Sequence, residues 1–298
     1  MTPAPIALFV YNRPAHTARA VESLLRNAEA AASVLHVFCD AAREPAAVAA
    51  VEAVRAQVRR IRGFRDIVIV ERARNLGLSG SIVDGVTQLC AAHGHAIVLE
   101  DDIEVSVFFL RYMNDALERY RDEPRVLAVG AYPFPAREPR PETFFFRIPD
   151  CWGWATWKRA WDHYEPDGAR LLAEIRRRGL GRDLDLEGAY PYVELLEAQL
   201  AGRADSWAVR WYAKTLLLGG LTLYPGRPMS RNTGMDGSGV HKDRNSRYEV
   251  ELATGPARVE AIAVREDPAE RERIASFLRR GHGGWRARLS AWFSTLAR

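Results

Sequence analysis

Three consecutive carboxylates, Glu100, Asp101 and Asp102, directly follow an apolar run at residues 96–99. Adjacent carboxylates repel one another, so the arrangement is unfavourable unless a cation or hydrogen-bond donors compensate. Hard divalent cations such as Mg²⁺ and Mn²⁺ bind oxygen ligands, and often only one or two of these are carboxylates, with substrate phosphates completing the shell. The triplet therefore predicts a metal-bridged diphosphate. The alternative is an acidic helix start with Asp101 as its N-cap.

Short apolar runs alternate with segments of helical spacing in the first half of the chain. This βαβα alternation predicts an α/β fold in which helices cover both faces of a mostly parallel sheet. The predicted strands are residues 6–11, 34–39, 67–70 and 96–99. Ligands of such sheets bind at the carboxyl ends of the strands. Arg13 follows the first strand, Asp40 the second and the acidic triplet the fourth, so we expect these residues to converge.

The second half of the chain is less regular. An aromatic-rich segment at residues 144–161 precedes predicted helices at 189–202 and 207–219, and a predicted strand at 221–226 leads into a glycine-rich polar loop at 231–243. The sequence shows no internal repeat and no low-complexity linker, which favours a single domain.

Composition narrows the classes of function. The chain has 298 residues, 48% of them hydrophobic and 27% charged, with a net charge of +4. This small excess suits an anionic small substrate or a membrane surface, whereas nucleic acid binding would call for a dense basic face interleaved with aromatics. Cys39, Cys90 and Cys151 are too far apart to indicate a disulfide framework or a zinc site. No signal peptide or membrane-spanning run is evident, so we expect a cytoplasmic protein.

The motifs after the predicted strands resemble those of a known group of enzymes. Arg13 in "YNRP", Asp40 in "FCDAA" and the triplet in "LEDDIEV" occur in the order seen in GT-A-fold glycosyltransferases, specifically the N-acetylglucosaminyltransferase I family and its bacterial family 2-like relatives. The resemblance extends from the first strand to the glycine-rich loop. It implies a GT-A, Rossmann-like fold.

The same resemblance implies a domain organisation. Residues 1–265 would form a single glycosyltransferase domain, with the nucleotide-sugar-binding half at 1–105 and the acceptor-side half at 106–265. A helical tail would occupy 266–298.

The resemblance also implies roles for the residues that match its motifs. Asp102 would bind the metal, Asp101 would lie near the ribose or sugar hydroxyls, and Glu100 near the donor sugar. Asp40 would contact the uracil, and Arg13 the diphosphate or nucleotide. The ligands implied are thus a UDP-sugar and a divalent cation, Mn²⁺ or Mg²⁺.

Further candidate positions lie in three segments. Asn75 in "RNLGLSGSI" resembles a loop residue beside the donor, although Ser79 in this segment could simply cap the next helix. Trp154 and Trp152 in "DCWGWATW" are candidates for stacking on sugar rings, while clustered tryptophans more often belong to a core. His241 in the glycine-rich loop, which resembles a lid over the donor, is a candidate second metal ligand.

The candidate catalytic base is Asp205 in "ADSWAVRW". The family has two adjacent aspartates before this helix, whereas this chain has Asp205 followed by Ser206. An N-cap role for Asp205 is the alternative. Asp236 and Asp150 are reserve candidates for the base.

The sequence therefore predicts a metal-dependent, inverting hexosyl- or N-acetylhexosaminyltransferase. It would transfer a sugar from a UDP-sugar to a glycan or other hydroxyl acceptor in the synthesis of a surface polysaccharide or glycoconjugate. The alternatives are a nucleotidyltransferase acting on sugar phosphates and a non-catalytic nucleotide-sugar-binding protein. A nucleotidyltransferase normally has a glycine-rich loop after its first strand, and "YNRPAHTARA" contains no glycine.

The end of the chain has an amphipathic pattern. One helical face carries apolar residues, namely Trp285, Leu289, Trp292, Phe293 and Leu296, and arginines lie elsewhere on the helix. The pattern is typical of an interfacial helix, so it predicts peripheral contact with the inner face of the cell membrane. Packing of this face on protein is the alternative.

Overall fold

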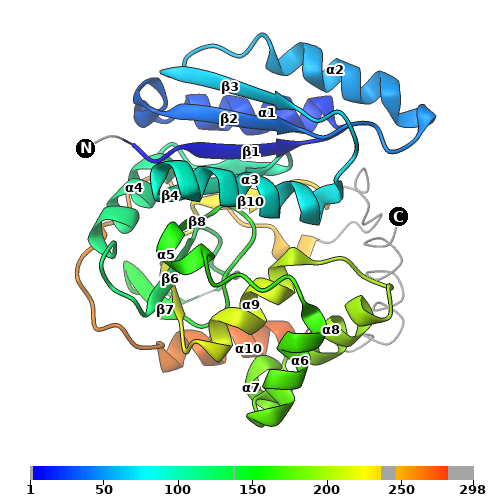
Figure 1. Ribbon diagram of the computed structural model, residues 1–298. Coiled ribbons are helices and arrows are strands. Elements are labelled where there is room, and N and C mark those ends of the chain that lie inside the picture. Colours follow the sequence, from blue (N-terminus) through cyan, green and yellow to red (C-terminus); the bar gives the residue numbers. More distant parts are fainter. Residues whose placement is uncertain (1–2, 137, 236–245, 281–298) are drawn as a thin grey trace.

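A computed structural model describes residues 3–136, 138–235 and 246–280. Its centre is an eight-stranded sheet in the order β3-β2-β1-β4-β8-β6-β9-β7 (Figure 1). The strands are β1 Ile6–Val10, β2 Val34–Cys39, β3 Asp66–Glu71, β4 His95–Glu100, β6 Val126–Gly130, β7 Thr143–Phe146, β8 Trp154–Trp157 and β9 Leu221–Pro225. Strands β3, β2, β1 and β4 are parallel, while β8 and β7 are antiparallel to their neighbours. The predicted α/β class with a mostly parallel sheet is confirmed.

The helices pack on both faces of this sheet. They are α1 Pro14–Leu25, α2 Val48–Val58, α3 Gly77–His93, α4 Phe109–Arg119, α5 Lys158–Trp161, α6 Gly168–Arg177, α7 Gly181–Leu184, α8 Tyr192–Leu200, α9 Trp207–Leu217 and α10 Pro268–Arg280, with 3₁₀ turns at Ala28–Ala32, Pro45–Ala47 and Ser246–Tyr248. Apolar side chains of α1, α2 and α4 join one core cluster and those of α3, α5 and α9 join another. The prediction of helices on both faces is confirmed.

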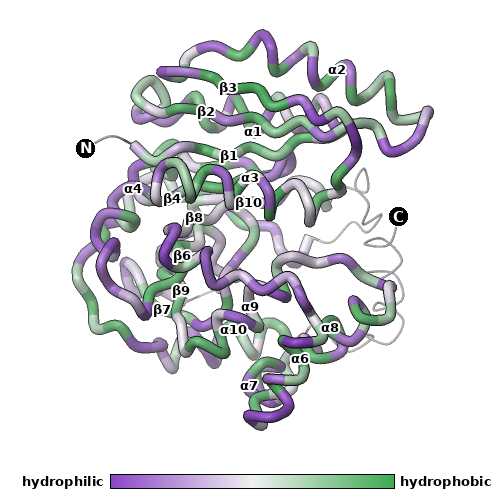
Figure 2. Tube along the Cα trace, viewed as in Figure 1, coloured by the Kyte–Doolittle hydropathy of each residue, from purple (hydrophilic) through white to green (hydrophobic). Residues whose placement is uncertain are grey.

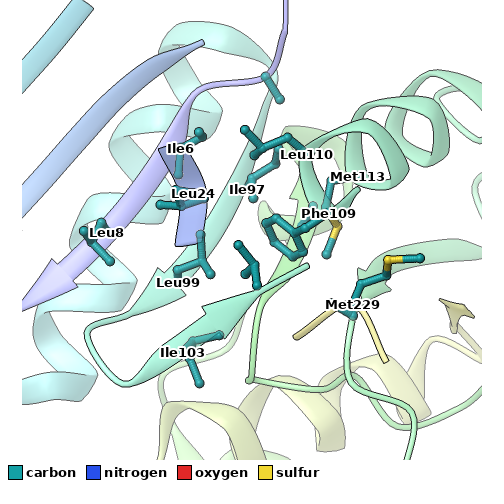
Figure 3. Packing of buried hydrophobic residues seen from close by; sticks show 14 of the residues in the cluster. Ile6, Leu8, Leu24, Ile97, Leu99, Ile103, Phe109, Leu110, Met113 and Met229 are labelled. Carbon is teal, nitrogen blue, oxygen red and sulfur yellow. The ribbon is translucent and has the colours of Figure 1, made fainter. Parts of the chain in front are cut away.

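Side-chain alternation along the strands explains this division. Successive side chains of a strand point to opposite faces of the sheet. In β1, Ile6 and Leu8 accordingly belong to the first cluster and Phe9 to the second. Figure 3 shows the first cluster, in which Leu24 of α1 and Leu99 of β4 pack with Ile6 and Leu8.

Helix α2 illustrates how the sequence pattern becomes a packed helix. Val51, Val54 and Val58 are spaced three and four residues apart and are buried, as the helical spacing predicts. The tube of α2 alternates between hydrophobic and hydrophilic colour (Figure 2). The helix therefore covers the sheet with one face and meets solvent with the other.

The predicted helices of the second half are slightly shorter in the structure. Helix α8 begins at Tyr192, directly after Pro191, and α9 ends at Leu217, two residues before Gly219. Gly219 has a φ of 64°, a left-handed conformation that glycine tolerates and that ends a helix. The predicted strand at 221–226 is confirmed as β9.

A two-stranded ribbon extends the fold beside the end of β4. Strand β5, Ile103–Val105, follows the acidic triplet and pairs antiparallel with β10, Ser230–Asn232. The alternative in which the triplet opens a helix is therefore wrong. The ribbon joins the end of β4 to a segment about 130 residues away in the sequence.

Helix α10 packs against the second half of the chain. Ile274 and Phe277 are buried in a third core cluster together with Phe144 and Phe146 of β7. The carboxylate of Glu270 accepts a hydrogen bond from Arg140 at 2.7 Å. The first part of the predicted tail is thus integrated with the core, whereas the amphipathic segment beyond residue 280 lies outside the described residues. Of the helices that are described, none is both long and apolar enough to cross a membrane.

Candidate active site

The carboxyl edge of the sheet gathers most of the predicted site residues. Strand β1 lies between β2 and β4 in the sheet. Strands β2 and β3 are added on one side of β1, and the next strand along the chain, β4, is added on its other side. Ligands of open α/β sheets bind at such a switch point, beyond the carboxyl ends of the strands. Arg13 follows β1 here, and the acidic triplet begins with Glu100, the last residue of β4.

Arg13 binds two carboxylates of the triplet. Its Nη2 donates to Oδ1 of Asp101 and, at 3.0 Å, to Oδ2 of Asp102. Asp101 and Asp102 are only 4% and 9% exposed, so these ion pairs are shielded from water. Burial alone would lower the pKa of Arg13, but the two carboxylates outweigh it and raise the pKa. The structure thus brings together the residues that the sequence predicts at a diphosphate site.

The acidic residues are themselves electrostatically strained. Burial raises the pKa of Asp101 to about 6, even though the charge of Arg13 acts in the opposite direction. Burial also raises the pKa of Glu100 well above its ordinary value, and the charges of Asp102 and Asp101 raise it further. An additional cation at this position would relieve the repulsion.

The segment after β10 packs directly against Asp102. The main-chain N–H of Thr233 donates to the carbonyl oxygen of Asp102 at 2.8 Å. A Cβ on Gly234 would lie 2.2 Å from Oδ2 of Asp102 and 3.0 Å from Nη1 of Arg13, so only glycine allows this close approach. The sequence indicated a glycine-rich lid here, but not this contact. The glycine-rich segment of the sequence includes residues 236–245, and Asp236 and His241 there lie outside the described residues.

The side chains of Asp40 and Asn75 form hydrogen bonds that hold two loops together. The Asp40 carboxylate accepts hydrogen bonds from the main-chain N–H groups of Ala41 at 2.9 Å, Leu76 at 2.9 Å and Gly77 at 3.0 Å. Asn75 donates from Nδ2 to the carbonyl oxygen of Ala41 at 2.7 Å. These bonds join the loop after β2 to the start of α3. The predicted contacts of both residues with a donor stay predictions.

Trp154 is not placed to stack on a sugar, which corrects the sequence prediction. Its side chain is 1% exposed, with its ring stacked on Trp207 at 5.0 Å and tilted against Trp161 at 5.7 Å. A sugar ring would have to displace these core contacts. Trp152 is partly exposed, and its ring centroid lies 4.6 Å from that of Tyr132, so it is the better placed of the two tryptophans.

Asp205 lies at the amino end of α9, near the start of α3. Its side chain is 56% exposed, and Oδ1 accepts a hydrogen bond from Nη2 of Arg210 at 3.1 Å. The same Nη2 donates to Oγ of Ser79 at 2.5 Å. The N-cap of α9 is Ser206, whose Oγ accepts a hydrogen bond from the N–H of Val209. The alternative in which Asp205 is the N-cap is therefore wrong.

Asp150, a reserve candidate for the base, lies close to Glu100. The sequence pattern did not predict this proximity. Oδ1 of Asp150 accepts from the N–H of Cys151 at 2.8 Å, and its Oδ2 is buried without a hydrogen-bond partner among residues 3–136, 138–235 and 246–280. Burial raises the pKa of Asp150 to about 7. Asp150 in turn contributes to the raised pKa of Glu100, so the two carboxylates are close enough to interact.

The arrangement fits a divalent cation that has few protein ligands. Oδ1 of Asp102 is buried and accepts no hydrogen bond from the residues that the structure describes, whereas Oδ2 binds Arg13. Within the described ranges there is no group of three or more His, Cys, Asp or Glu side chains that could hold a metal ion. Mg²⁺ is commonly bound through one or two carboxylates, with phosphates and water as further ligands. Asp102 suits that mode of binding.

No protein-family model and no curated protein sequence matches the chain. Among solved structures it is similar to Staphylococcus aureus TarS 1–349, with 10% identity over 78% of this chain and 60% of that one, at a TM-score of 0.43. It is also similar to mouse xyloside xylosyltransferase 1 in its apo form, with 11% identity over 72% and 81% and a TM-score of 0.42.

A third similar structure is the mannosyltransferase PcManGT from Pyrobaculum calidifontis in complex with GDP-Man and Mn²⁺, with 12% identity over 73% and 70% and a TM-score of 0.38. The chain covers 60% of TarS 1–349 and 23% of a second TarS chain, less than two thirds of either. The function is therefore argued from the site.

Proposed function

We propose that the chain is a metal-dependent, inverting glycosyltransferase with a GT-A fold. It would transfer a hexosyl or N-acetylhexosaminyl group from a UDP-sugar to a hydroxyl group of a glycan or glycoconjugate. The observation that carries the proposal is the buried cluster of Arg13, Asp101 and Asp102 at the switch point of the sheet, with one oxygen of Asp102 unengaged. Such a cluster suits a diphosphate and its cation.

The chain's own residues supply the groups that this reaction needs. Arg13 is held at the edge by the acidic pair and can donate to the oxygens of a leaving diphosphate. Gly234 lets the main chain approach Asp102 and fixes the position of its carboxylate. Asp102 would hold a divalent cation, which neutralises the charge that develops on the diphosphate.

Inversion requires a single displacement at the anomeric carbon, with one base to accept the proton of the acceptor hydroxyl. Asp205 is the candidate from sequence, and Asp150 is a second carboxylate at the same edge. No covalent intermediate is needed, so a second nucleophilic carboxylate has no part in the scheme.

The two rival functions differ in what they would require here. A nucleotidyltransferase would need main-chain N–H groups of a flexible loop after β1, but α1 begins at Pro14 and the loop contains no glycine. Asp150 has a buried oxygen that no described residue engages, and it lies outside the position proposed for the metal. A protein that only binds a nucleotide sugar would not need such a carboxylate.

UDP binding with and without Mn²⁺, measured by calorimetry, tests the metal site. We expect Mn²⁺ to increase the affinity of the wild type for UDP and Asp102→Asn to abolish that increase. Asp183→Asn is a matched control, because Asp183 also accepts from an arginine at 3.0 Å but lies before α8, away from this edge. Equal UDP affinity in Asp102→Asn and wild type, with Mn²⁺ present, would remove the metal assignment.

We also propose a cytoplasmic location with peripheral membrane contact through the amphipathic end of the chain, residues 284–298. Sedimentation with anionic liposomes tests this part. Binding by the full chain and its loss in a variant that ends at residue 280 are expected. Equal sedimentation of the two proteins would show that the tail does not anchor the chain.

A further inference from the structure

The register of β8 places Asp150 at the same edge as the acidic triplet. Strand β8 is antiparallel to β4, with Val98 opposite Trp154. Residues that precede Trp154 therefore run alongside residues that follow Val98. Asp150 lies four residues before Trp154, and Glu100, two residues after Val98, is the last residue of β4, so both carboxylates lie at the carboxyl end of β4.

Strand β6 encloses Asp150 from the other side. Strand β8 pairs antiparallel with β6 as well, and the N–H of Ala131, just after β6, donates to the carbonyl oxygen of Gly153 at 3.0 Å. The loop that begins with Asp150 therefore lies between the ends of β4 and β6. Ser230 of β10 also donates to the carbonyl oxygen of Trp152, which ties this loop to the ribbon beside Asp102.

The Asp150 carboxylate is anchored through one oxygen only. Oδ1 is held by the N–H of Cys151 at 2.8 Å, while Oδ2 is buried and has no hydrogen-bond partner in the described part of the chain. The main-chain N–H groups of Trp152 and Tyr132 favour the ionised form of Asp150 and lower its pKa, but neither reaches Oδ2 with hydrogen-bond geometry. A buried acceptor without a donor destabilises the fold. This orientation suits a carboxylate that accepts its hydrogen bond from a ligand.

The surroundings also suit proton transfer. The ionisable side chains that face Asp150 are Glu100, Cys151, Tyr132 and Tyr224, none of which is cationic. Without a compensating positive charge, burial raises the pKa of Asp150 to about 7. A general base is most effective when its pKa lies near the working pH.

Asp205 lacks this combination. Its side chain is mostly exposed, and its Oδ1 is engaged by Arg210. The neighbouring position, where the resembling family carries a second aspartate, is Ser206, whose hydroxyl caps α9. The region that the sequence indicates for the base therefore offers one carboxylate, already paired with a guanidinium.

We propose that Asp150 is the general base that accepts the proton of the acceptor hydroxyl. The inference rests on the proposed glycosyl transfer. The acceptor oxygen forms a bond to the anomeric carbon, the bond from that carbon to the diphosphate oxygen breaks, and its electron pair stays on the departing UDP. The hydroxyl proton moves to Oδ2 of Asp150 and passes to solvent after the product leaves.

Three variants of the full chain test the inference, namely Asp150→Asn, Asp205→Asn and the control Asp185→Asn. Asp185 is matched to Asp150 because it is partly buried, accepts a main-chain N–H from Val193 at 2.8 Å and has a pKa raised by burial, yet lies between α7 and α8. UDP release is measured with UDP-glucose, UDP-galactose and UDP-N-acetylglucosamine in the presence of Mn²⁺, with water as the acceptor.

Asp150→Asn is expected to lower kcat by about 10²–10⁴-fold. KM for the donor should stay unchanged, and Asp185→Asn should match the wild type in both constants. Circular dichroism checks that Asp150→Asn is folded, and Asp150→Glu, which restores a carboxylate, should regain part of kcat. If Asp150→Asn does not fold, the pH dependence of kcat is compared between Asp150→Glu and the wild type. The profile of Asp150→Glu should be shifted along the pH axis, and an unshifted profile counts against the inference.

Other outcomes would overturn the inference in distinguishable ways. Near-normal kcat in Asp150→Asn together with a fall of that size in Asp205→Asn would assign the base to Asp205. A raised KM with unchanged kcat in Asp150→Asn would make Asp150 a donor-binding residue. Failure of the wild type to bind or hydrolyse any of the donors would instead refute the proposed function itself.

Discussion

Replacing Asp150 by asparagine should change how the stability of the protein depends on pH. The carboxyl group has an ordinary pKa of 3.8 and a pKa of about 7 in the folded protein, because burial disfavours its charged form. Its neutral form therefore stabilises the fold below pH 3.8, and this stabilisation is lost as the pH rises towards and through 7. Asparagine keeps the oxygen that binds Cys151 but cannot ionise, so it removes this loss.

The size of the effect follows from the two pKa values. Between the ordinary and the raised pKa, the folded state holds one proton more than the unfolded state, so stability falls by about 1.4 kcal/mol for each pH unit. Integrated from about pH 5.5 to about pH 8.5, the loss is about 2 kcal/mol. The substitution also removes a like charge that acts on Glu100, which changes stability in the same direction.

Urea unfolding at several pH values, without added cation, measures the effect. The free energy of unfolding of Asp150→Asn minus that of the wild type should grow by about 2 kcal/mol over this range. Asp185→Asn controls for a general effect of removing a partly buried carboxylate whose pKa is raised by burial. A constant difference between Asp150→Asn and wild type would refute the reasoning, because Asp150 would then ionise alike in both states.

Three further predictions concern other parts of the molecule. Gly234→Ala should weaken Mn²⁺-dependent UDP binding by about 10–100-fold, because its Cβ would displace Asp102, and calorimetry with unchanged affinity would contradict this. Asp40→Ala should lower the free energy of unfolding by about 1–3 kcal/mol, since main-chain N–H groups lose their acceptor, and unchanged urea midpoints would argue against that role. Burial and His93 lower the pKa of His36, so the stability that neutral His36 contributes above pH 6.5 should be lost on acidification, and a His36→Gln variant should show a weaker fall between pH 7 and 5.

Local patterns were sufficient for the first half of the fold. The apolar runs that become β1, β2, β3 and β4 and the valine spacing of α2 follow from short-range periodicity, because each βαβ unit is continuous in sequence. The position of Arg13 opposite Asp101 follows from the same logic, since both come directly after parallel strands. These features need only the order of the elements.

The second half depended on pairings that no local pattern reveals. Trp154 appeared as a candidate for sugar stacking, but strand alternation in β8 directs its ring into the cluster with Trp207. The face to which it points is set by the register of β8 on β4, and a shift of one residue would reverse it. Burial of this tryptophan was therefore decided by tertiary structure.

The sequence by itself determined an α/β protein whose strand ends carry an arginine and an acidic triplet, because side-chain period and strand order are local properties. Only the tertiary structure decided that Asp150 lies beside Glu100 and that Gly234 touches Asp102. These neighbours are separated by about 50 and 130 residues along the chain, and antiparallel β8 and β10 bring them together. Folding buries Asp150 at this edge of the sheet, which raises its pKa, and it brings the charge of Asp150 close enough to raise the pKa of Glu100.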